Sequence, residues 1–592
     1  MKALPKLLFT ALLLALAAAL LSACNINFDG GKNEPPDGTP TEDEIIECDG
    51  YTLTVSGTVL RKVKYTVNGA AVKVTVPEGI TEIAYDAGRM LMSAVSITIP
   101  STLEVFRYST PIDYFGLDIH YPKVVEIYDL SPHFDFDLEN ASYSSCLKQN
   151  LKVIHKSAKE PSVLTEKDGF MYCTSADETI LVGITEPSEH VTVPAYYEGK
   201  PITLAPYAFA EAQSIEHITL SEGITAISKY CFYRTSITQI DLPTTLKSIE
   251  KYALICKISS ITLPDGIKRI EKGVFEGCSQ LTELNLPETV EYFDCSAIED
   301  TAVTSLYIPR SVTQLILELE YNSLEKISKF TVHPENKYYS SEDGVLFNKD
   351  GSRLIWYPSQ KADTVYTVPS RVRVIGEKAF YSADTLTAVV ISEGVERIEA
   401  KAFSSCNRLQ SITIPKTVSD IGEQAFYYSY HISFVSVHPD NPSYTEIEGV
   451  LFDKEVTELI FYPPSKAATT YTVPVTVTAV RDYAAYGSLN LKKLILPNGL
   501  RTIGEHAFDI WNDIILTVNF PDTLEYIGKG AFYDCDLVLT WNYTGDWKAT
   551  DNNGNTVILD KTHFDDLPNL KFKYLKDNYK YTLEKINSTS EN

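Results

Sequence analysis

The chain has 592 residues, of which 44% are hydrophobic and 22% are charged. This composition is typical of a folded protein, and the length allows several domains or one long repeat array. The 52 basic and 78 acidic residues give a net charge of −26. A chain this acidic repels phosphate backbones, so we expect no nucleic acid partner. The plainest explanation of the acid excess is a long surface that is kept soluble.

Residues 1–23 are predicted to be a signal peptide. Lys2 and Lys6 flank the start of an apolar run, Leu7–Leu21, that is too short for a comfortable membrane span, and small residues follow it. The segment "LSAC", residues 21–24, resembles the lipobox of bacterial lipoproteins. This resemblance implies cleavage before Cys24, a diacylglycerol on its sulfur, and acylation of the new amino group with a fatty acid such as palmitate.

Two or three acyl chains hold a protein stably to a bilayer, whereas one does not. The chain is therefore expected to be exported and lipid-anchored to the bacterial cell membrane or outer membrane, facing outward. The alternative is an ordinary secretory signal followed by an incidental cysteine.

The next two regions are expected to be a tether and an irregular start of the folded part. Residues 24–48 are rich in Gly, Pro, Asp and Glu and are expected to form a flexible tether. Residues 49–190 are expected to hold an N-terminal cap and degenerate repeats. In this stretch "CDGYTLTVSG" from Cys48 is interpreted as a capping hairpin, Val74–Phe106 as weak repeats, and "VVEIYDLS" and "LKVIHKSA" as further coils.

A repeat dominates residues 191–545, with weaker copies before it, and within each unbroken run neighbouring copies lie 21 to 24 residues apart. We number each copy from the residue that ends a segment such as "ITIP", which is called position zero. An aliphatic residue stands at position 3, isoleucine is usual at position 6, and Ala-Phe is frequent at positions 10 and 11. The zero positions are Pro77, Ser221, Pro243, Pro264, Pro287, Pro369, Ser392, Pro415, Pro474, Pro497 and Pro521.

This pattern predicts a solenoid. A single coil cannot bury its own apolar edge, so coils stack and each repeated position becomes a ladder in the core. The residues before position zero alternate apolar and polar side chains, which predicts a short parallel strand that proline ends. Ala beside Phe predicts a tight inner corner, with the ring filling the middle of the coil.

A second element recurs within the array. "HPENKYYSSEDGVLF" (333–347) aligns with "HPDNPSYTEIEGVLF" (438–452), and in both the glycine precedes position zero by 25 residues. Gly169 and Pro194 repeat that interval, so "DGFMY" is interpreted as a third copy. "NKDGSR" predicts a hairpin with a glycine turn. Hairpin coils are therefore expected near 333–369 and 438–474, and residues 546–592 are expected to be a C-terminal cap and a short β-rich tail.

"IGEKAF", "IGEQAF" and "IGEHAF", together with a cysteine three residues after the phenylalanine position, resemble the BspA-type leucine-rich repeat of bacterial surface proteins. The resemblance implies a β-rich leucine-rich-repeat solenoid of about 23 residues per coil with inserted β-hairpins. It also implies adhesion to host matrix proteins or to other cells, although a fold alone does not determine function.

The sequence contains no catalytic signature: no Gly-x-Ser-x-Gly, His-Glu-x-x-His, phosphate loop or dinucleotide fingerprint is present. We expect no enzyme, cofactor or metal site, although a site hidden in 106–160 or in the tail is an alternative. His333 and His438 share one repeat position and are interpreted as turn residues. Cys231, Cys278, Cys406 and Cys535 fall in core positions and are interpreted as structural thiols.

The remaining candidate is a surface. Residues that alternate with the buried ones on successive strands should form parallel polar stripes, the type of face that solenoids use for binding. The candidate binding face consists of Thr219, Asp241, Thr262, Asn285 and Tyr307, with His217, Gln239, Ser260, Glu283 and Ser305 two residues earlier. The expected partners are proteins or glycans on host or neighbouring cells. Stripes that merely solvate the sheet, and a structural envelope spacer without a specific ligand, are the alternatives.

Overall fold

The computed structural model describes residues 44–48, 51–65, 73–77, 79–83, 96–99, 105–106, 126–129, 153–155, 163–174, 179–206, 208–210, 212–317, 324–510, 515–576 and 580–586. The predicted signal peptide, Cys24 and most of the predicted tether lie outside these residues. The chain divides into two compact units. Unit 1 comprises residues 1–281 and 296–301, and unit 2 comprises residues 282–295 and 302–592.

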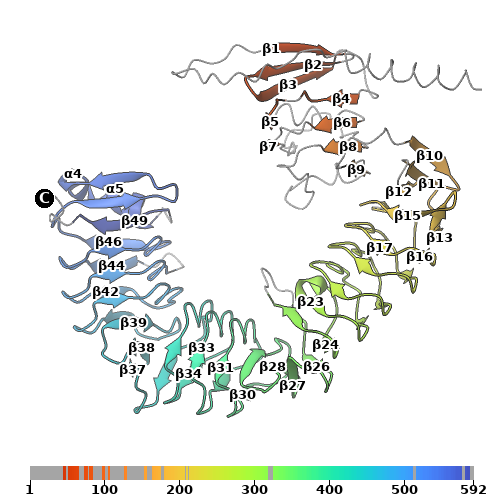
Figure 1. Ribbon diagram of the computed structural model, residues 1–592. Helices are drawn as coiled ribbons and strands as arrows, with labels where there is room; N and C mark the ends of the chain where they lie inside the picture. The colour runs from red at the N-terminus through yellow and green to blue at the C-terminus, as the bar shows by residue number, and fades with distance from the viewer. Residues whose placement is uncertain are drawn as a thin grey trace, which may run out of the picture. The chain divides into compact units, whose positions relative to one another are not determined.

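Unit 2 is built of stacked coils, and each regular coil contributes two strands (Figure 1). The longer strand ends just before position zero, as predicted. One run of these strands pairs in parallel at intervals of 23 residues, since Val365, Ala388, Ser411 and Phe434 are register partners. The strands of this kind are β22 (Glu283–Asn285), β24 (Ser305–Ile308), β26 (Lys329–Val332), β30 (Val365–Thr367), β32 (Ala388–Val390), β34 (Ser411–Ile414), β36 (Phe434–Val437), β40 (Thr470–Thr472), β42 (Lys493–Ile495), β44 (Ile515–Asn519) and β46 (Asp536–Thr540).

The second strand of each coil is a feature that the sequence did not reveal. It mostly has only two residues, at positions 5 and 6, and it pairs in parallel with the same positions of the next coil, as in Ile375 to Ile398 and Ile398 to Ile421. The isoleucine of position 6 is therefore both a core residue and a strand residue. These short strands in unit 2 are β23 (Tyr292–Asp294), β25 (Gln314–Ile316), β31 (Val374–Ile375), β33 (Arg397–Ile398), β35 (Asp420–Ile421), β41 (Ala479–Val480), β43 (Thr502–Ile503) and β45 (Tyr526–Ile527).

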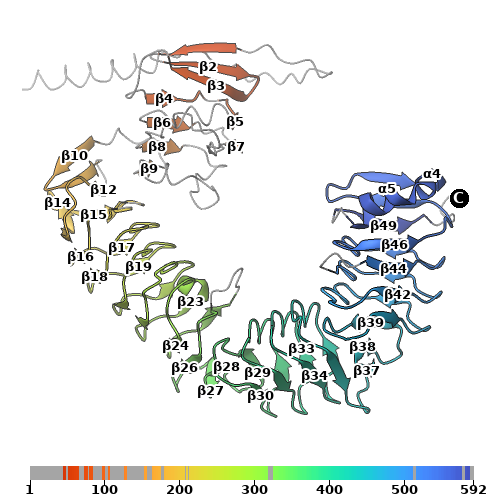
Figure 2. The same cartoon turned by 180° about the vertical axis from the view of Figure 1, so that it is seen from behind.

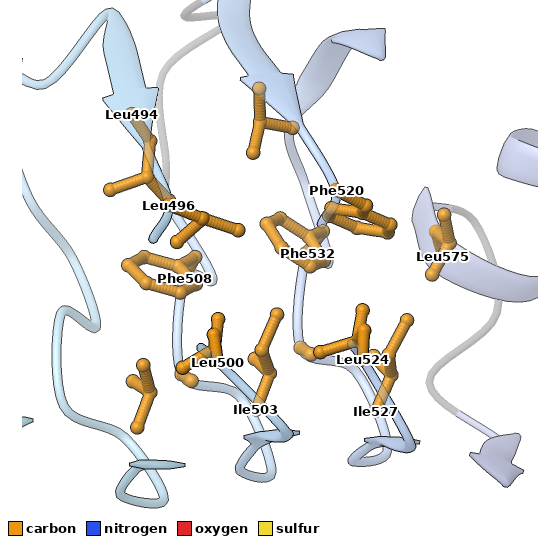
Figure 3. Close-up of a cluster of buried hydrophobic side chains, with 14 of the residues drawn as sticks. Leu494, Leu496, Leu500, Ile503, Phe508, Phe520, Leu524, Ile527, Phe532 and Leu575 are labelled. Atoms are coloured by element: carbon orange, nitrogen blue, oxygen red, sulfur yellow. The ribbon is translucent and has the colours of Figure 1, made fainter. Parts of the chain in front are cut away.

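The predicted core ladders are confirmed. Phe380, Phe403 and Phe426 are at most 4% exposed, and their rings stack with centroids 4.8 and 5.9 Å apart. Figure 3 shows the same arrangement for Phe508 and Phe532, which stack at 5.5 Å above the aliphatic residues of positions 3 and 6. The backbone continues the ladder, because the amides of Phe380, Phe403 and Phe508 each donate to the alanine carbonyl of the next coil. The Ala-Phe pair is thus the inner corner of the coil.

The glycine of the "IG" pair permits close stacking. A Cβ atom on Gly422 would lie 2.5 Å from the amide nitrogen of Ala400, in the preceding coil. On Gly528 it would lie 2.4 Å from the amide nitrogen of Glu505. Glycine is needed at these positions because the neighbouring backbone occupies the space of a side chain.

The two predicted hairpin coils of unit 2 are present. In the first, β27 (Tyr339–Glu342), β28 (Val345–Asn348) and β29 (Arg353–Trp356) are antiparallel, and β29 then pairs in parallel with β31. In the second, β37 (Tyr444–Ile447), β38 (Val450–Asp453) and β39 (Glu458–Phe461) repeat this order before β41. The "DG" and "EG" turns have positive φ at both central residues, as a two-residue type I′ hairpin requires. Gly351, at φ 72°, lies in the predicted "NKDGSR" turn.

A buried asparagine attaches each hairpin coil to the coil before it. Asn441 is fully buried, and its Nδ2 donates to the carbonyl groups of Pro415 and Val418 at 2.7 and 2.9 Å. Its Oδ1 accepts from two amides of its own turn, including that of Tyr444 at 2.8 Å. Asn336 makes the same set of bonds in the first hairpin coil. His438 stands 23 residues after Pro415, directly after β36, and its Nδ1 accepts from the amide of Asp440, so its interpretation as a turn residue is confirmed.

Unit 1 carries the same elements. The "CDGYTLTVSG" and "DGFMY" segments form antiparallel triplets that continue into parallel strands, as in the hairpin coils of unit 2. The first triplet corrects the predicted tether, because Glu44–Cys48 is strand β1 and Ile46 is buried. The triplets and their continuations are β1 (Glu44–Cys48), β2 (Tyr51–Ser56), β3 (Val59–Tyr65), β5 (Glu82–Ile83) and β7 (Val105–Phe106), then β10 (Val163–Lys167), β11 (Phe170–Thr174), β12 (Thr179–Ile184), β15 (Lys200–Leu204) and β14 (Tyr196–Tyr197).

The other strand pairs of unit 1 that the structure describes in register are parallel. The "VVEIYDLS" and "LKVIHKSA" segments, expected as coils, contain β8 (Glu126–Asp129) and β9 (Val153–His155), which continue the sheet of β4 (Lys73–Thr75) and β6 (Ser96–Ile99). Longer strands before position zero are β13 (His190–Val193), β16 (His217–Leu220), β18 (Gln239–Asp241) and β20 (Ser260–Thr262). Short strands are β17 (Ala226–Ile227), β19 (Ser248–Ile249) and β21 (Arg269–Ile270), and a 3₁₀ turn spans Cys295–Ile298.

The predicted β-rich tail is wrong for residues 561–576. Helices α4 (Lys561–Asp565) and α5 (Leu567–Lys571) and a π-helical turn, Phe572–Lys576, lie beside the last strands of unit 2, as Figure 2 shows from behind. The segment "LKFKYL" alternates like a strand, but it buries Leu570, Tyr574 and Leu575 against the last coils and leaves Phe572 43% exposed. Three strands complete this end of unit 2: β47 (Trp547–Thr550), β48 (Thr556–Leu559) and β49 (Thr582–Lys585).

Within the described residues, no helix combines the length and the apolar character that a membrane span needs.

Candidate functional site

Three of the longer strands of unit 1 place predicted site residues in two rows. Strands β13, β16 and β18 pair in parallel, so that His190, His217 and Gln239 are neighbours, as are Thr192, Thr219 and Asp241. The residues between them, such as Ile218, point into the core. The alternation that was predicted from the sequence is therefore present, and His217, Thr219, Gln239 and Asp241 stand on the outer face.

These outer side chains form one hydrogen-bonded network around Asp241. His217 Nε2 lies 2.7 Å from Asp241 Oδ2, and Thr219 Oγ1 donates to the same oxygen at 3.1 Å. Gln239 Nε2 donates to Oδ1 at 3.2 Å. The hydrogen bond from His217, followed by that from Gln239, holds the pKa of Asp241 below its ordinary value. The rings of His190 and His217 meet edge to face at 5.4 Å and extend the polar row to β13.

An open groove of about 520 Å³ lies between β18 and β20. Its lining includes Gln239 and Asp241 on one side and Ser260 and Thr262 on the other. Strands β18 and β20 are not hydrogen-bonded neighbours in the sheets that the structure describes. Four predicted residues therefore lie on the two walls of one groove, and His217 and Thr219 are joined to it through Asp241.

The groove coincides with a shortened coil. The coil from Pro243 to Pro264 has 21 residues, whereas the unit 2 coils with a continuous sheet from β30 to β36 have 23. The missing residues come from the segment that leads into the long strand. Leu254 stands four residues before the buried Ile258, and Phe403 stands six before the equivalent Leu409. The shorter lead-in thus coincides with the break in the sheet between β18 and β20.

The other four predicted site residues belong to unit 2. Glu283 and Asn285 lie on β22, and Ser305 and Tyr307 lie on β24, all on the outer face. Tyr307 donates a 2.6 Å hydrogen bond to Oε1 of Glu288. Burial and this hydrogen bond raise the pKa of Tyr307 to about 12, so its hydroxyl keeps its proton at neutral pH.

The cysteines in core positions are buried free thiols. Cys406 Sγ donates to the carbonyl of Phe380, and Cys535 Sγ donates to that of Phe508, both at 3.0 Å. Burial raises the pKa of both thiols to about 12, so neither is a reactive thiolate at neutral pH. Among the described residues, no group of three or more His, Cys, Asp or Glu is arranged to hold a metal ion.

The chemistry of the groove is hydrogen bonding. Its lining includes one amide, one carboxylate and four hydroxyl side chains, while its apolar lining residues, Ile240, Leu242 and Ile261, belong to the strands and loop beneath. The sequence identified these polar residues by their alternation, but it did not show that the sheet opens between them. The only available signal was the length of the coil, 21 residues instead of 23.

A family model described as the BspA type leucine rich repeat region matches residues 202–326, 362–465 and 454–553, with six copies. No curated protein matches the chain. Among solved structures, the pneumococcal vaccine antigen PcpA is similar over 65% of this chain and all of its own, at 16% identity and a TM-score of 0.44.

Two further solved structures are similar. A leucine-rich repeat protein from Eubacterium ventriosum is 19% identical over 67% of this chain and all of its own, with a TM-score of 0.39. A leucine rich cell surface protein from Faecalibacterium prausnitzii is 21% identical over 60% of this chain and 93% of its own, also with a TM-score of 0.39. Since no TM-score among these three reaches 0.5, the family assignment rests on the repeat model.

Proposed function

Because the chain belongs to the family of BspA-type leucine-rich repeat proteins, we propose that it is a lipid-anchored surface protein that binds other macromolecules. The proposed binding face is the outer side of the longer strands in unit 1, with the groove between β18 and β20 at its centre. The observation that carries this proposal is the convergence of Gln239, Asp241, Ser260 and Thr262 on one open groove.

The position of the protein is part of the same proposal. The "LSAC" segment favours acylation at Cys24 and display outside the cell. Adhesion to host matrix proteins or to other cells is the role that the family resemblance favours. Replacement of Cys24 by serine should abolish incorporation of radiolabelled palmitate and release the protein from the membrane fraction. External protease should digest the solenoid on intact cells, and complete protection would contradict surface display.

Binding is tested by blocking the groove. Ser260→Arg places a long side chain on its wall, whereas Ser248→Arg places the same side chain on β19, at an exposed site of the short-strand sheet. The wild-type protein should be captured by at least one immobilised extracellular-matrix protein, and Ser260→Arg should reduce this capture at least tenfold. Ser248→Arg should bind like the wild type. Equal binding by both variants would place the binding surface elsewhere.

A glycan is the second candidate ligand, favoured by the lining of the groove. Hydroxyl, amide and carboxylate groups suit a hydroxylated ligand, whereas protein interfaces usually centre on aromatic or aliphatic anchors. The same two variants on a glycan array separate the candidates. Capture by glycans but not by matrix proteins supports this alternative, and silence of both assays for the wild type would contradict binding.

A further inference from the structure

Two cysteines in neighbouring coils of unit 1 point at the same atom. Cys256 Sγ donates to the carbonyl oxygen of Leu254 at 3.3 Å, and Cys278 Sγ donates to that oxygen at 2.9 Å. The amide nitrogen of Cys256 also lies 3.5 Å from Cys278 Sγ. Both residues are free thiols in this structure, and they are 5% and 0% exposed. The two sulfur atoms therefore share one hydrogen-bond acceptor.

One of the two cysteines stands in the shortened coil. Cys278 stands three residues after Phe275, the usual cysteine position, whereas Cys256 stands only two after Leu254. Cys406 has no such neighbour, since the equivalent residue of the next coil is Ser429, which donates to its own acceptor, Phe403. Strands in adjacent coils are about 4.8 Å apart, which is compatible with the Cα separation of about 4.4–6.8 Å that a disulfide requires.

We propose that Cys256 and Cys278 form a disulfide that links two coils next to the groove. The proposal rests on the export that is part of the proposed function, because disulfides form and persist in oxidising compartments outside the cytosol. Among the cysteines that the structure describes, this site differs from the others in having two thiols at one acceptor. It is a modification site of the scaffold, distinct from the residues proposed to contact a ligand.

The oxidant is an external disulfide, such as that of an oxidoreductase or of oxidised glutathione. The Cys256 thiolate attacks one of its sulfur atoms and releases the other half as a thiolate. The Cys278 thiolate then attacks Cys256 Sγ and releases the second half. Two protein thiols lose their hydrogens, and the external disulfide is reduced to two thiols. Because both cysteines are buried, exchange should be fast during folding and slow in the folded protein.

The link would hold the segment that leads into the groove. Cys256 precedes β20 by four residues, and the amide of Lys257 donates to the carbonyl of Ile237, in the coil that carries β18. A disulfide at Cys256 would attach the same segment to the following coil, which carries Cys278. Oxidation should therefore restrict movement of the wall that carries Ser260 and Thr262.

Peptide mapping of the full-length protein tests the proposal without any ligand. The protein is refolded with oxidised glutathione, alkylated with iodoacetamide in denaturant, and digested with trypsin. We expect the peptide Tyr252–Lys257 to be linked to the peptide that begins at Gly273, with a mass about 2 Da below the sum of the reduced peptides. Fragmentation should assign the bond to Cys278 rather than to Cys295, which lies on the same tryptic peptide.

Complete alkylation of both cysteines, or a bond from Cys256 to another cysteine, would overturn the proposal. Cys278→Ser should remove the linked peptide, and Cys406→Ser, which changes a buried thiol without a partner thiol, should leave it in place. The mapping of the wild-type protein decides the question even if a variant fails to fold. A negative result here leaves the groove and its binding assays unaffected.

Discussion

Single residues serve two different purposes in this protein: some leave space for the backbone of a neighbouring coil, and others form hydrogen bonds with it or with its side chains. Gly422 illustrates the first demand, because the backbone of Glu399 and Ala400 lies where its Cβ would be. Asp241 illustrates the second on the surface, where one carboxylate collects donors from His217, Thr219 and Gln239. In both cases the partner comes from an adjacent coil or the same strand.

Gly422→Ala should destabilise unit 2 by roughly 1–3 kcal/mol, because a methyl group 2.5 Å from a backbone nitrogen forces the coils apart. Gly499→Ala is the matched control, since the nearest atom to its added Cβ, the carbonyl oxygen of Val475, is 3.7 Å away. Urea unfolding of the two variants measures the difference. Equal midpoints would show that the coils relax without cost.

Asp241→Asn should change how stability depends on pH. The pKa of Asp241 is lowered in the folded state, so its contribution is complete above the unfolded pKa, about 3.9, and is lost as the pH falls through the folded pKa. The melting temperature of the wild type should exceed that of Asp241→Asn most above about pH 4, and the difference should shrink towards pH 2. Asp265→Asn, at an exposed turn, serves as the control; a pH-independent difference for Asp241→Asn would contradict the assignment.

At the scale of elements, a regular coil and a hairpin coil differ in how they satisfy the backbone hydrogen-bonding groups of the coil before them. A regular coil pairs backbone with backbone at both of its strands. Beside β35 the second hairpin coil supplies side chains instead. Asn441 donates hydrogen bonds to the carbonyl groups of Pro415 and Val418. The hydroxyl of Tyr444 accepts a hydrogen bond from the amide of Ile421 at 2.9 Å. This is why "HPxN" and a following tyrosine recur together in both hairpin coils.

Asn441→Ala should destabilise unit 2 by roughly 1–3 kcal/mol or more, because it leaves buried carbonyl and amide groups without partners. Asn498→Ala, at an exposed turn position, should have an effect within about 0.5 kcal/mol. Thermal unfolding monitored by circular dichroism compares them. Should both variants melt like the wild type, the asparagine would not be what attaches the hairpin coil.

The C-terminal helices are the other element with a distinct task. Every solenoid has to cover the apolar face of its last coil. Here Leu570, Tyr574 and Leu575 cover it, and Lys571 Nζ donates to the carbonyl of Leu537 on β46 at 2.7 Å. A helix suits this position because one face can be buried while the lysines between remain at the surface.

At the scale of the molecule, a mutation in one coil should destabilise only that coil and its immediate neighbours, because each coil contacts only the coils next to it. Phe403→Ala removes a ring that is stacked between Phe380 and Phe426, at an expected cost of about 3–5 kcal/mol. Amide hydrogen exchange should accelerate in the coils that contain Phe380 and Phe426 and remain unchanged at β46. Phe434→Ala, at a ring that is 44% exposed, is the control. Uniform acceleration throughout unit 2 would show that it unfolds as one block.

Much of the fold could be predicted from the sequence, because a repeated spacing indicates which residues of successive coils are in contact. Once Ile398 and Ile421 occupy the same position of successive coils, stacking makes them neighbours, and the strand, the core ladder and the hairpin turns follow from local rules. The candidate face followed for the same reason, since side chains alternate along each strand.

Other features depended on the tertiary structure. The short strands at positions 5 and 6, the opening between β18 and β20, the common acceptor of Cys256 and Cys278 and the helical cap were not evident from the sequence. The first three features depend on how far the backbone of one coil lies from that of the next, and the cap depends on the end of the stack. That distance depends on the lengths of both coils together and on the surface left uncovered at the end of the stack, and no single repeat encodes either quantity.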